Sequence, residues 1–170
     1  MSYDLSKPLV IGISSRALFN LEQENKIFEE QGVEAYEAYQ VTHENEILQK
    51  GAAFQLIKAF LKLNNTGLGR LVEVIIMSRN NANTCLRIFN SIQYYGLDIT
   101  RATLTSGAEI APYLKAFKTD LFLSANSVDV QSAINDGIAA GLILTGAAHA
   151  DAKQKIDQIR IAFDGDAVLF

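Results

Sequence analysis

The chain has 170 residues, 49% of them hydrophobic, with one cysteine, two histidines and a net charge of −4. Length and composition predict one globular domain in the cytoplasm, because a lone cysteine forms no internal disulfide and the N-terminus lacks an apolar signal core. The acidic balance argues against nucleic acid as a partner, and no apolar run is long enough to cross a membrane.

The first predicted element is a buried strand with a polar turn behind it. The run Leu9–Ile13 is apolar and β-rich, and Ser14, Ser15 and Arg16 follow it directly. Ligand sites in open α/β sheets lie beyond the carboxyl ends of strands, so Ser14 and Arg16 are candidates for contacting an anion. The alternative is that the serine caps the next helix while Arg16 is solvated.

A long helical stretch comes next, from 21 to 65. Apolar residues recur there at helical spacing, and Gly32 interrupts them. Residues 20–65 are too many for one crossover between strands, so we expect an inserted helical cap. Tyr36 and Tyr39 could stack on a base, although their spacing favours packing into the core.

The polar run 42–46 within this insertion is a second candidate for contacting a substrate. It contains His43 and Asn45, which could recognise the polar edge of a ligand. The alternative is a solvated helix end with His43 close to carboxylates.

A second predicted strand, 71–77, also ends in polar residues. Ser78 and Asn80 follow it, before a helix predicted at 82–95. A hydroxyl and the backbone amides of a helix start are the groups that bind phosphate. A serine or asparagine that caps the helix would use the same atoms, so both interpretations stay open.

Strands and helices then alternate to residue 159. Strands are predicted at 99–104, 120–123 and 139–144, and helices at 110–117, 128–134 and 152–159. This alternation predicts an α/β fold, a doubly wound parallel sheet of five or six strands, in a single domain over 1–170.

The last dozen residues, 159–170, carry the strongest chemical signal. Asp164 and Asp166 lie two positions apart in an apolar run, so a strand would aim both at one point. Two such carboxylates repel each other unless one is protonated or a hard cation such as Mg²⁺ lies between them. One could then attack a phosphoryl group while the other acts as general acid and base. The alternative is an exposed hairpin turn at Asp164-Gly165.

A short internal repeat links the two ends of the chain. Ile13–Leu18 can be aligned with Phe163–Val168, 150 residues later, and the first copy lacks both carboxylates. The repeat suggests a duplicated domain, in which the first copy has lost its acidic pair and 159–170 begins a second, catalytic half.

Longer motifs resemble those of the cytosolic 5'-nucleotidase type I family, part of the haloacid dehalogenase superfamily. They are Ser15–Phe19, Glu30–Tyr36, His43–Glu46, Gly51–Phe54, Tyr113–Phe117 and Ala162–Phe170. The resemblance implies a Mg²⁺-dependent phosphatase acting on nucleoside 5'-monophosphates of the AMP or IMP class. It makes Asp164 the nucleophile that forms an aspartyl-phosphate and Asp166 the general acid and base, with both carboxylates binding Mg²⁺.

The chain also departs from the pattern of that superfamily, which needs a hydroxyl residue, a lysine and a further acidic pair. Ser78 resembles the first, but Ile110 occupies the lysine position and Ser124-Ala125-Asn126 the acidic position. The first half is therefore expected to be a degenerate copy, and the 170-residue chain to be inactive alone. The alternative is a non-catalytic α/β module that binds a nucleotide or pairs with a subunit, using Ser14, Arg16 and Ser78.

The apolar run at the chain end carries one further expectation. If 162–170 forms an uncovered edge, we expect a homo-oligomer or pairing with a catalytic half.

Overall fold

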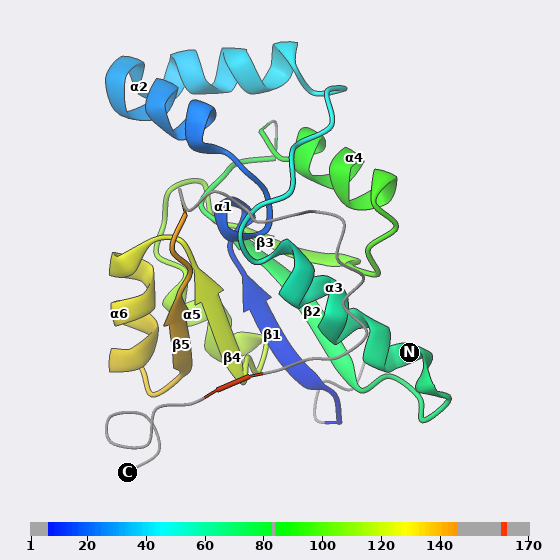
Figure 1. Cartoon of the computed structure of the whole chain (residues 1–170). Helices are drawn as coiled ribbons and strands as arrows, with labels where there is room; N and C mark the ends of the chain where they lie inside the picture. The colour runs from blue at the N-terminus through cyan, green and yellow to red at the C-terminus, as the bar shows by residue number, and fades with distance from the viewer. Residues whose placement is uncertain (1–6, 83, 146–160, 163–170) are drawn as a thin grey trace.

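The computed structural model describes residues 7–82, 84–145 and 161–162, and every structural statement below concerns these residues. Five parallel strands form one sheet in the order β3-β2-β1-β4-β5 (Figure 1). The strands are β1 Leu9–Ile13, β2 Val72–Ser78, β3 Arg101–Leu104, β4 Leu121–Ser124 and β5 Ala139–Leu142. The predicted α/β class with a parallel sheet is confirmed.

Helices cover both faces of this sheet. They are α1 Ser15–Leu18, α2 Glu22–Thr42, α3 Phe54–Lys62, α4 Leu86–Tyr94, α5 Ala111–Ala116 and α6 Ser127–Asn135, with a 3₁₀ turn η1 at Leu63–Thr66. One core joins α1, α3 and α4 to one face, and a second joins α5 and α6 to the other. Strand order reverses beside β1, so the tips of β1 and β4 flank the crevice where doubly wound sheets bind ligands.

Helix α3 packs its apolar stripe on the sheet. The buried residues of this stripe are Ala53, Phe54, Ile57, Phe60 and Leu61. These residues recur at helical spacing, so they share one face of α3 and join the same core as β1 and β2.

Helix α2 lies over the carboxyl ends of the strands rather than against a face of the sheet (Figure 1). Gly32, with φ 85° and ψ −177°, breaks it into two arms, at the interruption predicted from the sequence. Phe28 and Val33 beside the break stay about half exposed. The prediction that Tyr36 and Tyr39 pack into the core is wrong, because both are only partly buried and Tyr39 stacks on His43 instead.

Some predicted boundaries are also wrong. Helix α4 begins at Leu86, four residues after the predicted start, because Asn81 first forms a turn by accepting a hydrogen bond from the Thr84 N–H at 3.0 Å. Neither Ser78 nor Asn80 caps this helix. In the part of the chain that the structure describes, no helix has both the length and the apolar content needed to cross a membrane.

Candidate functional site

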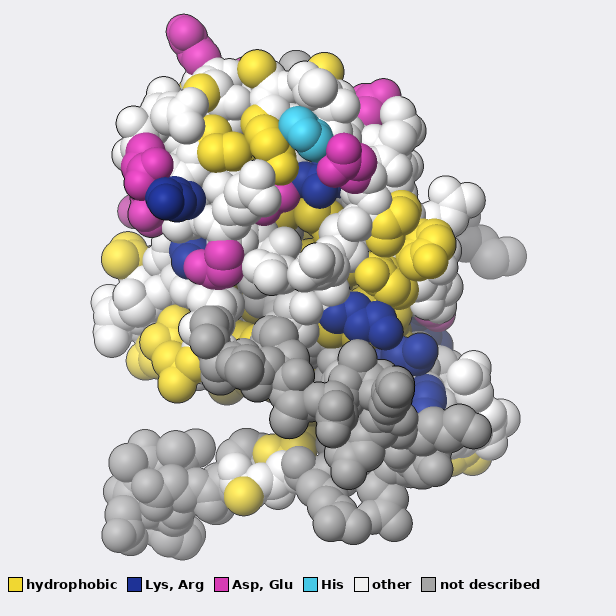
Figure 2. Space-filling model, turned by 45° about the horizontal axis from the view of Figure 1, so that its top comes forward, with side chains coloured by type: hydrophobic (Ala, Val, Ile, Leu, Met, Phe, Trp, Pro, Cys, Tyr) yellow, Lys and Arg dark blue, Asp and Glu magenta, His cyan; other side chains and the backbone are white. Residues whose placement is uncertain are grey.

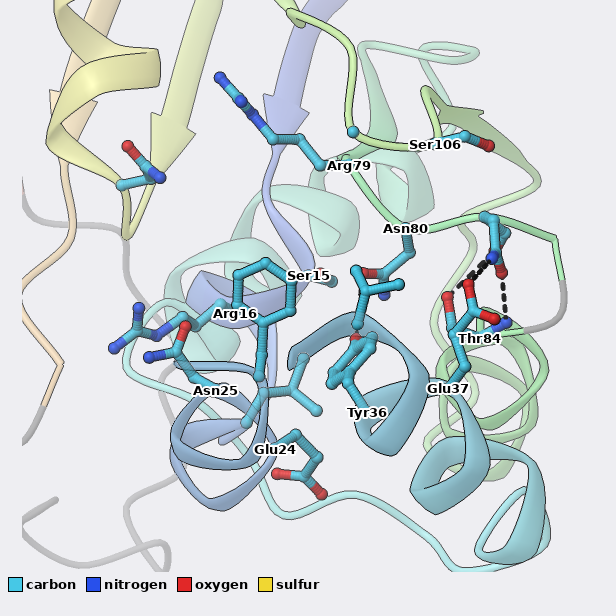
Figure 3. Close-up of a pocket in the computed structure, with 16 residues that line it drawn as sticks. Ser15, Arg16, Glu24, Asn25, Tyr36, Glu37, Arg79, Asn80, Thr84 and Ser106 are labelled. Atoms are coloured by element: carbon cyan, nitrogen blue, oxygen red, sulfur yellow. Dashed lines mark hydrogen bonds between the residues drawn. The ribbon is translucent and has the colours of Figure 1, made fainter. Parts of the chain in front are cut away.

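A pocket of about 570 Å³ lies between α2 and the tips of the strands (Figure 3). Both arms of α2 line it, together with residues that follow β1, β2, β3 and β4. The lining residues are Ser15, Arg16, Leu21, Glu24, Asn25, Phe28, Val33, Tyr36, Glu37, Arg79, Asn80, Asn81, Thr84, Ser106, Gly107 and Asn126. The volume is in the range of small-molecule sites, and the position is where doubly wound sheets bind ligands.

Hydrogen bonds of Ser14 join the tips of β1 and β4. Its Oγ accepts from the N–H of Ala17 at 3.3 Å and from that of Ala125 at 3.2 Å. The first bond caps α1, which confirms the helix-cap interpretation. Beyond β4, Asn126 Oδ1 caps α6 by accepting from the N–H groups of Val128 and Asp129. These oxygens therefore already act as acceptors for backbone donors.

The tip of β2 supplies the polar centre of the pocket. Ser78 is buried, its Oγ accepts from the Asn80 N–H at 3.2 Å, and it lies 3.3 Å from Ser15 Oγ. The hydroxyl of Tyr36 donates to Asn80 Oδ1 at 3.0 Å, which connects α2 to the strand tip. Asn80 Nδ2 is buried and has no hydrogen-bond partner among the described residues. Such a donor is uncommon in a folded protein, and the group beside it is the Cys85 thiol, which is a weak acceptor.

The loop after β3 forms the far wall. Ser106 has a left-handed backbone, with φ 49°, and its N–H donates to Asn80 O at 3.3 Å, while Gly107 donates to Arg79 O at 2.8 Å. A non-glycine residue held in this conformation is often found at a ligand site. Only one sign of this wall can be read from the sequence, the polar loop at Thr105-Ser106-Gly107 directly after a predicted strand.

Every charged side chain that lines the pocket has a close partner. Arg16 makes two hydrogen bonds to Glu22, at 2.9 and 3.0 Å, and these lower the pKa of that carboxyl. Arg79 pairs with the buried Asp129. The two acidic residues in the lining, Glu24 and Glu37, pair with Arg87 and with the Asn81 amide. The predicted solvated state of Arg16 is therefore only partly right, since it is ion-paired at the rim.

The two candidates from the end of α2 lie outside this pocket. His43 caps the carboxyl end of α2, where its Nδ1 lies 2.7 Å from Tyr39 O. Asn45 is exposed and lines a separate shallow hollow with Asn90, Gln93 and Tyr94. The structure thus brings Ser14, Ser78 and Asn80 together at the strand tips and leaves His43 and Asn45 apart from them. The spacing of residues along a helix does not predict that His43 and Asn45 lie away from the strand tips, because their position depends on how α2 is oriented over the sheet.

The residues at these strand tips do not fit a Mg²⁺ site. Within residues 7–82, 84–145 and 161–162, no group of three or more His, Cys, Asp or Glu side chains could hold a metal. Where a hard cation would need carboxylates, β1 and β4 are followed by Ser14 and Asn126, whose oxygens accept backbone N–H groups. The predicted ligands Asp164 and Asp166 lie outside the described residues.

Cys85 lies beside the site, and its thiol is unreactive. It is the only cysteine of the chain and is almost fully buried. Burial raises the pKa of its thiol to about 12, against a smaller lowering by the Asn80 amide. The thiolate is the reactive form, so Cys85 is an unreactive residue of the core.

We expect Cys85 to react with a disulfide reagent about a thousandfold more slowly in the folded chain than in urea at about pH 8, because the thiolate fraction falls with the raised pKa. The release of the coloured thiol, followed in parallel samples, measures both rates. Folded and denatured rates within tenfold of each other would contradict the burial of this thiol.

Comparison of the sequence with known proteins identifies a family and a human relative. The sequence model of a family described as 5'-nucleotidase matches residues 1–170. Human cytosolic 5'-nucleotidase 1B is 42% identical over 172 residues, an alignment that covers 95% of this chain and 27% of that protein. The chain thus spans about a quarter of the length of this relative. No solved structure matches.

Proposed function

The chain belongs to the 5'-nucleotidase family, and on this premise we propose that it is part of a hydrolase that removes the phosphate of nucleoside 5'-monophosphates. The observation that carries the proposal is the family match over all 170 residues, including the Asp164-Gly165-Asp166 motif. AMP and IMP are the proposed substrates. The human relative is named as cytosolic, and the cytoplasm is the proposed location.

In the proposed reaction the two aspartates have separate tasks. The carboxylate of Asp164 attacks phosphorus, the bond from phosphorus to the ribose oxygen breaks, and Asp166 gives its proton to that oxygen. Asp166 then takes a proton from water, which attacks the aspartyl-phosphate and releases inorganic phosphate. Mg²⁺, bound by both carboxylates, would supply positive charge for the phosphoryl oxygens.

We further propose that the described domain is a non-catalytic copy and that 159–170 begins the catalytic one. Support comes from the neutral side chains at its strand tips, Ser14 after β1 and Ser124 and Asn126 around the end of β4. The buried Ile110 at the position expected for a lysine agrees with this assignment. Within the non-catalytic copy, 20–65 would be the cap, because α2 covers the strand tips as a cap would.

A chimera tests this function. We expect the chain alone to release almost no phosphate from AMP or IMP with Mg²⁺, since the lysine and second acidic pair are missing from it. A chimera in which the chain replaces the matching segment of human cytosolic 5'-nucleotidase 1B should release phosphate, and a chelator should stop it. Colorimetric phosphate measurement follows both. A folded chimera that binds Mg²⁺ yet leaves AMP and IMP intact would contradict the proposal.

A second candidate function is a non-catalytic module that binds a ligand or pairs with a catalytic half. The pocket under α2 favours ligand binding over pairing, because it is well formed without any catalytic group. Pairing through 162–170 stays a proposal that light scattering can test, and a monomer across the micromolar range would contradict it.

A further inference from the structure

The pocket under α2 has no net charge, although a phosphate site would need positive charge. Its ionisable lining consists of Arg16, Arg79, Glu24 and Glu37, so positive and negative groups balance. Figure 2, a view toward α2, shows single Lys and Arg side chains beside acidic ones over this helix, whereas adjoining Lys and Arg side chains gather lower in the view, to the right of its centre. A phosphate monoester carries about −1.5 to −2 charges at neutral pH, so it would have to be met by cations that are free to turn toward it.

Arg79 is not free in this sense, and Arg16 lies in an exposed ion pair at the rim of the pocket. Figure 3 shows both guanidinium groups pointing away from the space between Ser15, Asn80 and Tyr36. Arg16 is held by two hydrogen bonds to Glu22, and Arg79 by Asp129, whose side chain is 6% exposed. Turning Arg79 inward would leave the Asp129 carboxylate buried without its cation, which is strongly unfavourable.

The interior of the pocket instead offers neutral groups. Asn80 Nδ2 is a buried donor without a partner, and the Cys85 thiol beside this amide is a poor acceptor. Next to it the rings of Phe28 and Tyr36 meet edge to face, with centroids 5.9 Å apart. Ser15 and Thr84 add hydroxyl groups to the lining. A planar ring with an acceptor edge, attached to a hydroxylated group, would use all of these features.

We propose that this pocket binds a nucleoside and discriminates against the corresponding nucleotide. The ligand class rests on the proposed function, because a nucleoside is what remains after the 5'-phosphate is removed. Asn80 donates to the base, Phe28 and Tyr36 contact its ring, and Ser15 and Thr84 receive the ribose. The non-catalytic domain would thereby bind the product of the catalytic one.

Calorimetry on the full chain tests the proposal with four probes, adenosine, inosine, AMP and inorganic phosphate. We expect at least one nucleoside to bind, AMP to bind about tenfold more weakly or worse, and phosphate neither to bind nor to compete. AMP binding as tightly as adenosine, competition by phosphate, or no heat with either nucleoside up to its solubility would each overturn the proposal.

Three variants connect the binding to these residues. Asn80→Ala removes the unpartnered donor and should weaken nucleoside binding about tenfold or more, whereas Asn45→Ala in the separate hollow should leave it unchanged. Because Asn80→Ala also breaks the bond to Tyr36, Phe28→Ala is the second test, since Phe28 is 47% exposed and outside the core. Folding is checked by thermal unfolding. Equal losses in Asn80→Ala and Asn45→Ala, or full binding by Phe28→Ala, would overturn the assignment.

Failure of this inference and failure of the proposed function give different results. Calorimetry needs no turnover, so nucleoside binding by the chain together with an inactive chimera would contradict only the proposed hydrolase. Phosphate release by the chimera without nucleoside binding by the chain would contradict only the pocket.

Discussion

Replacing Asp164 with asparagine is expected to lower phosphate release by the chimera by at least about a thousandfold, as removal of a covalent nucleophile does in other enzymes. An amide oxygen is a far weaker nucleophile than a carboxylate, and the neutral side chain also loses charge toward Mg²⁺. The measurement is the initial rate with AMP or IMP at saturating Mg²⁺.

Asp136→Asn is the matched control for this variant. Asp136 lies at the end of α6, where it forms an exposed pair with Lys115 at 3.5 Å. The same chemical change there should leave the rate within about twofold, because exposed ion pairs contribute little to stability. An Asp164→Asn chimera that keeps a tenth of the activity would rule out a covalent role for this carboxylate.

Arg87→Met should lower the free energy of unfolding by roughly 3–5 kcal/mol, the usual cost of leaving a buried charge without its partner. Arg87 and Glu24 are 8% and 6% exposed, and their charged atoms lie 2.5 Å apart. The guanidinium also donates to Glu46 O at 2.9 Å, so one side chain connects α4 to both ends of the segment that contains α2. Urea unfolding followed by circular dichroism gives the value.

Two further variants separate the loss of charge in Arg87→Met from its loss of packing. Glu24→Gln combined with Arg87→Met should recover part of the loss, because no buried carboxylate is then left unpaired. Lys26→Met is the control on the same helix, since its pair with Glu30 is 3.8 Å long and well exposed, and should change stability by less than about 0.5 kcal/mol. A double variant no more stable than Arg87→Met would show that packing, and not charge, explains the loss.

The sheet could be predicted from the sequence because its signals are local. Runs such as Leu9–Ile13 and 71–77 contain consecutive apolar residues, which is typical of strands buried on both faces. Their carboxyl ends must share one edge of a parallel sheet, so the meeting of Ser14, Ser78 and Asn80 was also predictable.

The wall that α2 contributes could not be predicted in the same way. Phe28 and Val33 are about half exposed, and the helix joins the sheet mainly through polar contacts such as Tyr36 to Asn80. Such contacts leave no periodic apolar pattern. The pairing of Arg79 with Asp129, 50 residues away, likewise has no local signal, although it changes the expected ligand from an anion to a neutral molecule.

The break at Gly32 decides how far one segment of chain can reach around a ligand. A straight helix of 21 residues would be about 31 Å long and would pass over the strand tips as a rod, touching one side of a ligand at most. With the bend, Phe28 on one arm and Tyr36 on the other approach within ring contact. The angle between the two arms of α2 is thus governed by a single pair of torsion angles. They belong to a residue whose φ of 85° is one that side-chain-bearing residues rarely adopt.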